Sequence, residues 1–84
     1  MYYVYVQHSL TDHHFYIGFT SNISARMEQH KNGKVESTKH RKDLKLIYVE
    51  CYLLESDARR NEKYYKTSKG KIDLRKKLGS YLGP

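Results

Sequence analysis

The segment Phe15 to Gly33 (FYIGFTSNISARMEQHKNG) contains a strand followed directly by a helix. Its first six residues, Phe15 to Thr20, are rich in aromatic and β-branched side chains, which is typical of a β-strand. Gly18 lies in the middle of this strand. A glycine inside a strand marks a place where another group can approach the backbone closely.

The second half of the segment predicts a helix with a start and an end. Ser21 or Asn22 can cap the helix, which runs to about Asn32, and Gly33 is placed to end it. Three residues at helical spacing form a less polar stripe: Ile23, Met27 and His30.

Two further strands are expected outside this segment. Met1 to Gln7 (MYYVYVQ) is β-branched and aromatic, and the polar residues Thr11 to His14 connect it to the strand at Phe15. This short connection predicts an antiparallel hairpin. Leu44 to Leu54 (LKLIYVECYLL) predicts the third strand.

The C-terminal third is expected to be helical. Ser56 can cap a second helix that runs to about Ser68 and is ended by Gly70. The apolar residues of a last short helix would be Ile72, Leu74 and Leu78. The order is ββαβα plus a short C-terminal helix, an α+β class with a three-stranded antiparallel sheet flanked by helices.

Length and charge limit the possible functions. The 84 residues predict one domain spanning 1–84, and 16 Lys and Arg against 9 Asp and Glu give a formal charge of +7. Such a basic balance favours nucleic acid over a membrane surface as partner. Cys51, the one cysteine, excludes an internal disulfide and is expected to be a small buried residue. Without a signal peptide or membrane span, the expected location is the cytoplasm.

The second helix places a carboxylate on its less polar face. Ala58, Glu62 and Tyr65 are spaced i, i+4, i+7, so Glu62 points towards the protein body. It is either paired with an Arg or Lys, or a ligand for a hard divalent cation.

Arg26 and His30 share one side of the first helix. They are either a solvated Arg and a half-buried His, or a pair that faces a phosphate.

Other basic residues can contact a phosphate backbone or simply be solvated. These candidates are Lys39, Arg41 and Lys42 in a loop and Lys63 and Lys66 on the second helix.

The order of these features resembles the GIY-YIG nuclease superfamily over almost the whole chain. Tyr16-Ile17-Gly18 matches the second family motif, whereas Tyr3-Val4-Tyr5 is a degenerate form of the first. The stretch Arg26 to Gly33 fits the Arg-x-x-x-His-x-x-Gly pattern, and Glu55 to Lys66 fits the glutamate helix. The similarity is to small single-domain members related to the excision-repair nuclease domain and to intron-encoded endonucleases.

The resemblance implies a role for each matching residue. Tyr5 corresponds to a candidate general base and Tyr16 to a tyrosine that supports the base or the water. Arg26 would stabilise charge on the scissile phosphate, and His30 would position or protonate groups. Glu62 would be the protein ligand of one Mg²⁺ or Mn²⁺ ion. Tyr5 would then need cationic neighbours such as Arg26 to lower its pKa.

The implied function is Mg²⁺-dependent endonucleolytic hydrolysis of DNA, structure- or damage-directed and related to DNA repair or recombination. An accessory protein would supply specificity. The alternative is a non-catalytic, basic nucleic-acid-binding module with the same fold, since Ile72 to Arg75 lacks the asparagine that many active members place in this region. A third possibility is a small basic adaptor for an acidic protein.

Overall fold

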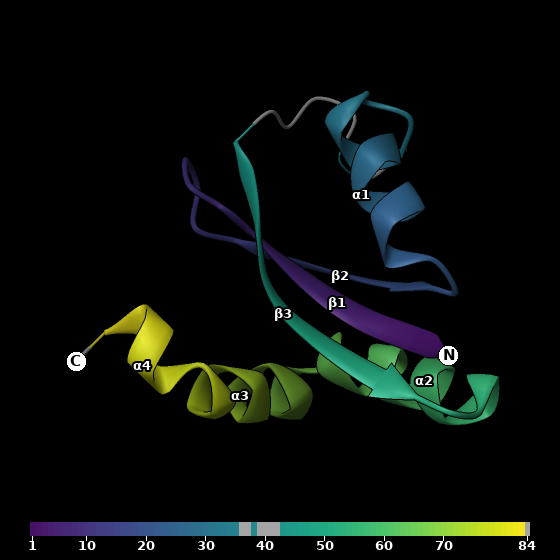
Figure 1. The fold of residues 1–84 in the computed structure, drawn as a ribbon. Helices are drawn as coiled ribbons and strands as arrows, with labels where there is room; N and C mark the ends of the chain where they lie inside the picture. The colour runs from purple at the N-terminus through teal and green to yellow at the C-terminus, as the bar shows by residue number, and fades with distance from the viewer. Residues whose placement is uncertain (36–37, 39–42, 84) are drawn as a thin grey trace.

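A three-stranded antiparallel sheet forms the centre of the protein (Figure 1). The computed structural model describes residues 1–35, 38 and 43–83. Strands β1 (Tyr2–Ser9), β2 (Phe15–Thr20) and β3 (Leu44–Tyr52) are arranged in the order β2-β1-β3. The predicted α+β class and antiparallel sheet are confirmed, and β1 is the central strand.

The predicted hairpin joins β1 to β2 through a polar turn. The Asp12 carboxylate accepts a hydrogen bond from the backbone N–H of His14 at 3.0 Å. His13 adopts a φ of 64°, in the left-handed region that few residues outside turns adopt. The resulting register places Tyr5 opposite Gly18 and Gln7 opposite Tyr16.

Helix α1 (Ile23–Lys31) begins and ends as its local sequence predicts. The Asn22 side chain accepts a hydrogen bond from the Ala25 backbone N–H at 3.0 Å. Asn32 follows the last turn, and Gly33 has a φ of 69°, which suits a glycine after a helix.

The C-terminal third differs from the expected pair of helices. Helix α2 (Glu55–Tyr65) starts one residue before Ser56, so the prediction of Ser56 as its cap is wrong. Gly70 does not end α2 either, because it lies in the first turn of α3 (Ser68–Lys77). The last predicted helix is therefore longer than expected, and a final turn, α4 (Gly79–Leu82), follows it.

The helices cover the two faces of the sheet unequally. Val4 and Val6 of β1 face α2 and α3, where the buried core comprises Val4, Val6, Ala58, Tyr65, Leu74 and Leu78. Tyr5 and Gln7 point to the opposite face because side chains alternate along a strand. Figure 1 shows α1 on one side of the sheet and α2 and α3 on the other.

Two expectations for the third strand need correction. The strand ends at Tyr52, and the exposed residues Leu53 and Leu54 lead into α2. Cys51 is exposed rather than buried. It lies on the edge strand and alternates with Glu50 and Tyr52, which point towards the core face. Ile72, expected to cover the core, is also exposed, at 56%.

Within the described residues, none of the helices combines the length and apolar character that a membrane crossing requires.

Candidate active site

Tyr5 lies across β2 at the position that Gly18 leaves open. A Cβ atom added to Gly18 would lie 2.3 Å from both Cζ and the hydroxyl oxygen of Tyr5. Tyr5 is 4% exposed, so its ring has little room to move aside. The group predicted to approach Gly18 is therefore the family's first-motif tyrosine, and glycine is needed here for space.

His30 connects Tyr5 to the segment that follows α1. The Tyr5 hydroxyl and His30 Nε2 are 2.8 Å apart, and His30 Nδ1 is 2.6 Å from Thr38 Oγ1. Both His30 and Thr38 are buried. With one ring nitrogen bonded on each side, His30 is held in a fixed orientation and can exchange a proton with Tyr5.

Thr38 was not predicted from the sequence. It lies in a polar segment where no periodicity distinguishes one residue from the next, and its role arises from a contact eight residues back in the chain. A hydroxyl residue a short distance after the helix histidine is the one signal that points to it.

The electrostatics of Tyr5 differ from the expectation. Burial raises the pKa of Tyr5, the charge of Arg26 lowers it, and the charge of Glu62 raises it. Arg26 acts in the expected direction, but burial outweighs it, so the expected lowering of the pKa is wrong. Burial and the charge of Arg26 both lower the pKa of His30, which favours the neutral imidazole.

Arg26 lies close enough to act on both Tyr5 and His30. Its side chain is half-buried, and its Nε has no hydrogen-bond partner among the residues that the structure describes. A buried guanidinium nitrogen without a partner is costly unless an acceptor meets it. The buried Nε is not accessible itself, but the residue is only half-buried, so the exposed part of the Arg26 guanidinium can meet an anionic ligand such as a phosphate.

Glu62 lies on the inner side of α2, as its spacing predicts. Its neighbours on this stripe, Ala58 and Tyr65, are buried, while the Glu62 side chain is 17% exposed. The carboxylate pairs with Lys66 Nζ at 2.9 Å. The two interpretations of Glu62 thus coexist, because the glutamate has a lysine partner and is also near enough to affect the Tyr5 hydroxyl.

The donor chemistry of Glu62 fits a single hard cation. Divalent magnesium commonly keeps several waters and takes one or two carboxylates together with phosphate oxygens. Among the described residues, no group of three His, Cys, Asp or Glu side chains could form a metal cage. The protein side therefore offers one carboxylate, and substrate and water would supply the remaining oxygens.

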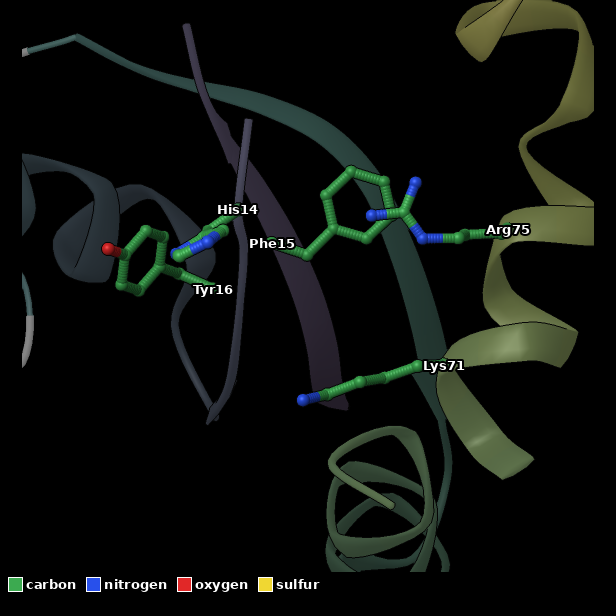
Figure 2. Close-up of a pocket in the computed structure, with 5 residues that line it drawn as sticks. All are labelled: His14, Phe15, Tyr16, Lys71 and Arg75. Atoms are coloured by element: carbon green, nitrogen blue, oxygen red, sulfur yellow. The ribbon is translucent and has the colours of Figure 1, made fainter. Parts of the chain in front are cut away.

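Tyr16 lies on β2 two residues before Gly18 and lines a cavity of about 260 Å³ at the edge of the sheet. The other lining residues are His14, Phe15, Lys71 and Arg75 (Figure 2). Tyr5 and His30 are thus in direct contact, and the charges of Arg26 and Glu62 act on Tyr5, whereas Tyr16 lines the cavity.

The structure describes only two of the five basic residues that were predicted to contact nucleic acid. Lys63 is exposed on α2, and Lys66 is exposed directly after the last residue of this helix. Lys39, Arg41 and Lys42 lie outside the described residues.

Comparisons with known proteins agree with this geometry. Residues 1–77 match the family model of the GIY-YIG catalytic domain. The chain is 38% identical over 59 residues to a UPF0213 protein of Bacillus licheniformis, covering 69% of this chain and 61% of that protein. It is 40% identical over 68 residues to a UPF0213 protein of Limosilactobacillus reuteri, covering 77% and 70%.

A third relative, a UPF0213 protein of Staphylococcus haemolyticus, is 38% identical over 66 residues, covering 77% of this chain and 79% of that protein. No solved structure gives a significant match. The family model covers nearly the whole chain, including both tyrosine motifs, the Arg–His helix and the glutamate helix. The chain therefore belongs to the GIY-YIG family of nuclease catalytic domains.

Proposed function

We propose that this domain is a DNA endonuclease that hydrolyses phosphodiester bonds with one Mg²⁺ or Mn²⁺ ion. The observation that carries the proposal is the Tyr5–His30 hydrogen bond of 2.8 Å. The Tyr5 ring lies against Gly18, and the charge of Arg26 lowers the pKa of Tyr5 against the larger effect of burial. The charge of Glu62 acts on the same hydroxyl from α2.

In the proposed reaction, a water oxygen forms a bond to phosphorus while the P–O bond to the leaving oxygen breaks. The water proton passes to the Tyr5 oxygen, and the Tyr5 proton passes to Nε2 of neutral His30. Because the pKa of Tyr5 is raised, Tyr5 needs such an acceptor to act as a base near neutral pH. Arg26 offsets the negative charge that grows on the phosphate oxygens.

Glu62 would hold the divalent ion, which when bound polarises the phosphate and stabilises the leaving oxygen. Lys66 occupies one side of this carboxylate at 2.9 Å. It is 53% exposed and can swing into solvent, or bind a second phosphate of the substrate. Lys63, beside it on α2, would also contact the DNA backbone.

The proposal also covers the extent of the domain, its location in the cell and its DNA substrate. We propose that residues 1–84 act as one domain in the cytoplasm, on structured or damaged DNA, in repair or recombination. An accessory protein would supply specificity. The +7 formal charge favours DNA association but provides no base-specific contact by itself.

The test is cleavage of supercoiled plasmid and of flap, fork and bubble DNA with Mg²⁺ or Mn²⁺. Tyr5→Phe, Arg26→Ala and Glu62→Gln are each expected to lose about 100-fold or more in rate, the scale typical of a removed base or charge stabiliser. Glu28→Gln removes a carboxylate from an exposed position of α1 and is the matched control, expected to cut normally.

Equal cleavage by wild type and the three variants would refute the proposal and indicate a contaminating nuclease. Salt-sensitive DNA binding without cleavage in either metal would refute it in favour of the non-catalytic nucleic-acid-binding module.

A further inference from the structure

We propose that the cavity at the edge of β2 binds the DNA backbone beside the scissile phosphate, with Lys71 and Arg75 as the phosphate contacts. This inference rests on the proposed function and names where the substrate strand runs. The cavity of about 260 Å³ lies between β2 and α3 and is lined by His14, Phe15, Tyr16, Lys71 and Arg75.

The first argument is the charge of the cavity. Lys71 and Arg75 are one helical turn apart on α3, so they share a face of the helix. Among the residues described in the structure, neither forms an ion pair with a carboxylate, whereas Lys66 and Lys77 do. Two uncompensated cations that converge on one cavity favour an anionic ligand.

The second argument is the orientation of Arg75. Its guanidinium carbon lies 4.7 Å from the centre of the Phe15 ring, a cation–π contact that fixes the side chain over β2. Figure 2 shows the guanidinium against Phe15, with the Lys71 amine below it. An arginine held in this way loses less conformational entropy on binding a phosphate than a free one.

The third argument is position. Tyr16 is shared by the cavity and the catalytic motif, and Gly18, under the Tyr5 ring, is two residues further along β2. Two to three strand residues span roughly 7 to 10 Å, a length that one to three nucleotides of DNA cover. The cavity is therefore placed for a phosphate near the scissile one and on the same strand.

The fourth argument is size and shape. The cavity is smaller than the pockets that enclose a drug-sized ligand, which begin at roughly 300 Å³. In Figure 2, His14 and Tyr16 lie on one side of β2, and Phe15 and Arg75 lie on the other, so the cavity follows the strand edge. This form suits local contact with a polymer that continues in both directions.

The experiment measures DNA affinity as a function of salt in a Glu62→Gln background, so that binding is observed without cleavage. The double variant Lys71→Ala/Arg75→Ala is expected to weaken binding about tenfold and to reduce the slope of log K against log salt by about 1.5. Lys69→Ala/Lys76→Ala removes the same charge from exposed positions of α3 outside the cavity, and is expected to change affinity less than threefold.

A second measurement locates the contact. Single uncharged methylphosphonate linkages are placed one at a time along the strand, on either side of the cleavage position. One linkage within three nucleotides is expected to weaken wild-type binding and to have no additional effect in the Lys71→Ala/Arg75→Ala variant. This non-additivity would identify the phosphate that the cavity holds.

Equal losses in the two double variants, or none in either, would overturn the inference, as would methylphosphonate effects that simply add at every position. Such a result leaves the cleavage losses of Tyr5→Phe and Glu62→Gln untouched, so failure of the cavity is distinguishable from failure of the nuclease. Thermal unfolding of both double variants checks that their folds are intact.

Discussion

At the residue scale, the site depends on the placement of the Tyr5 ring between Gly18 and His30. The ring is buried, its hydroxyl bonds His30 at 2.8 Å, and the backbone of β2 lies directly beneath it. Any side chain at position 18 must displace the ring. The glycine of the second motif and the tyrosine of the first are therefore coupled through space, although twelve residues lie between them in sequence.

Gly18→Ala is expected to destabilise the fold by roughly 1–3 kcal/mol, as overpacking does, and to lower cleavage at least about tenfold. The added methyl would lie 2.3 Å from Tyr5 and would break the bond to His30. Chemical denaturation and nicking rates measure the two effects.

Gly79→Ala is the matched control. A Cβ at Gly79 meets nothing within 4 Å, and alanine suits α4 better than glycine. This variant is expected to be neutral or slightly stabilising. If Gly18→Ala equals Gly79→Ala in stability and in nicking rate, the Tyr5 ring does not pack against residue 18.

His30 is expected to set the acid limit of the reaction. Burial, with the charge of Arg26, lowers its pKa below 6.5, so the neutral form persists in mildly acidic solution. Below that pKa the ring is cationic and cannot take the Tyr5 proton, and cleavage should decrease. Because the unfolded chain binds this proton more readily, stability also decreases as pH falls below 6.5.

His30→Gln tests this assignment through pH profiles. The variant is expected to lose about 100-fold in rate at neutral pH and to lack the part of the acid decline that His30 causes. Wild type and variant profiles of the same shape would remove His30 from the proton path.

At the element scale, local signals predicted β2 and α1 almost to the residue. Asn22 and Gly33 act within their own turns, so the sequence alone is sufficient there. The break between α2 and α3 was predicted at Gly70 but lies at Lys66 and Thr67, because Gly70 packs against the end of α2 instead of ending that helix. A Cβ at Gly70 would lie 1.8 Å from the Tyr64 carbonyl oxygen, where α3 packs against the end of α2.

The candidate site likewise contains residues that the sequence pattern indicates and residues that only tertiary contacts bring in. The family pattern identified Tyr5, Arg26, His30 and Glu62 by their order along the chain. It could not identify Thr38, or the cavity that Lys71 and Arg75 share with β2, because both arise from contacts between distant elements. The Lys66 partner of Glu62 was considered only as one of two alternatives, since spacing does not show which charge the carboxylate meets.

Thr67→Ala is expected to destabilise the protein by about 1 kcal/mol, the usual cost of a lost N-cap. The Thr67 hydroxyl accepts a hydrogen bond from the Gly70 backbone N–H at 3.0 Å and starts α3. Thr67→Ser keeps the hydroxyl, so its free energy of unfolding should decrease by only a few tenths of a kcal/mol. Urea denaturation separates the two variants, and equal stabilities would show that the cap contributes nothing.

At the scale of the whole molecule, Glu50 connects three elements around one carboxylate. Tyr48 donates from β3 at 2.6 Å, Tyr65 from α2 at 2.5 Å and Lys77 from α3 at 3.1 Å. Tyr52 donates to the same group. Burial raises the pKa of Glu50, but these hydrogen bonds together outweigh it and bring the pKa down to about 2. The carboxylate thus holds β3, α2 and α3 together by hydrogen bonds, next to the apolar core that packs the same elements.

This arrangement predicts how stability depends on pH. The pKa of Glu50 is lower in the folded protein than its ordinary value of 4.5, so its contribution is complete above pH 4.5 and is lost as pH falls towards 2. Glu50→Gln is expected to lose about 2 kcal/mol at pH 7, and the difference from wild type should narrow progressively below pH 4.5. Denaturation midpoints measured from pH 7 to pH 3 give this curve. Glu28→Gln, which removes the same charge from an exposed site, should leave the curve unchanged. A constant difference between Glu50→Gln and wild type across that range would mean that packing at Glu50, and not its ionised carboxylate, connects β3 to α2 and α3.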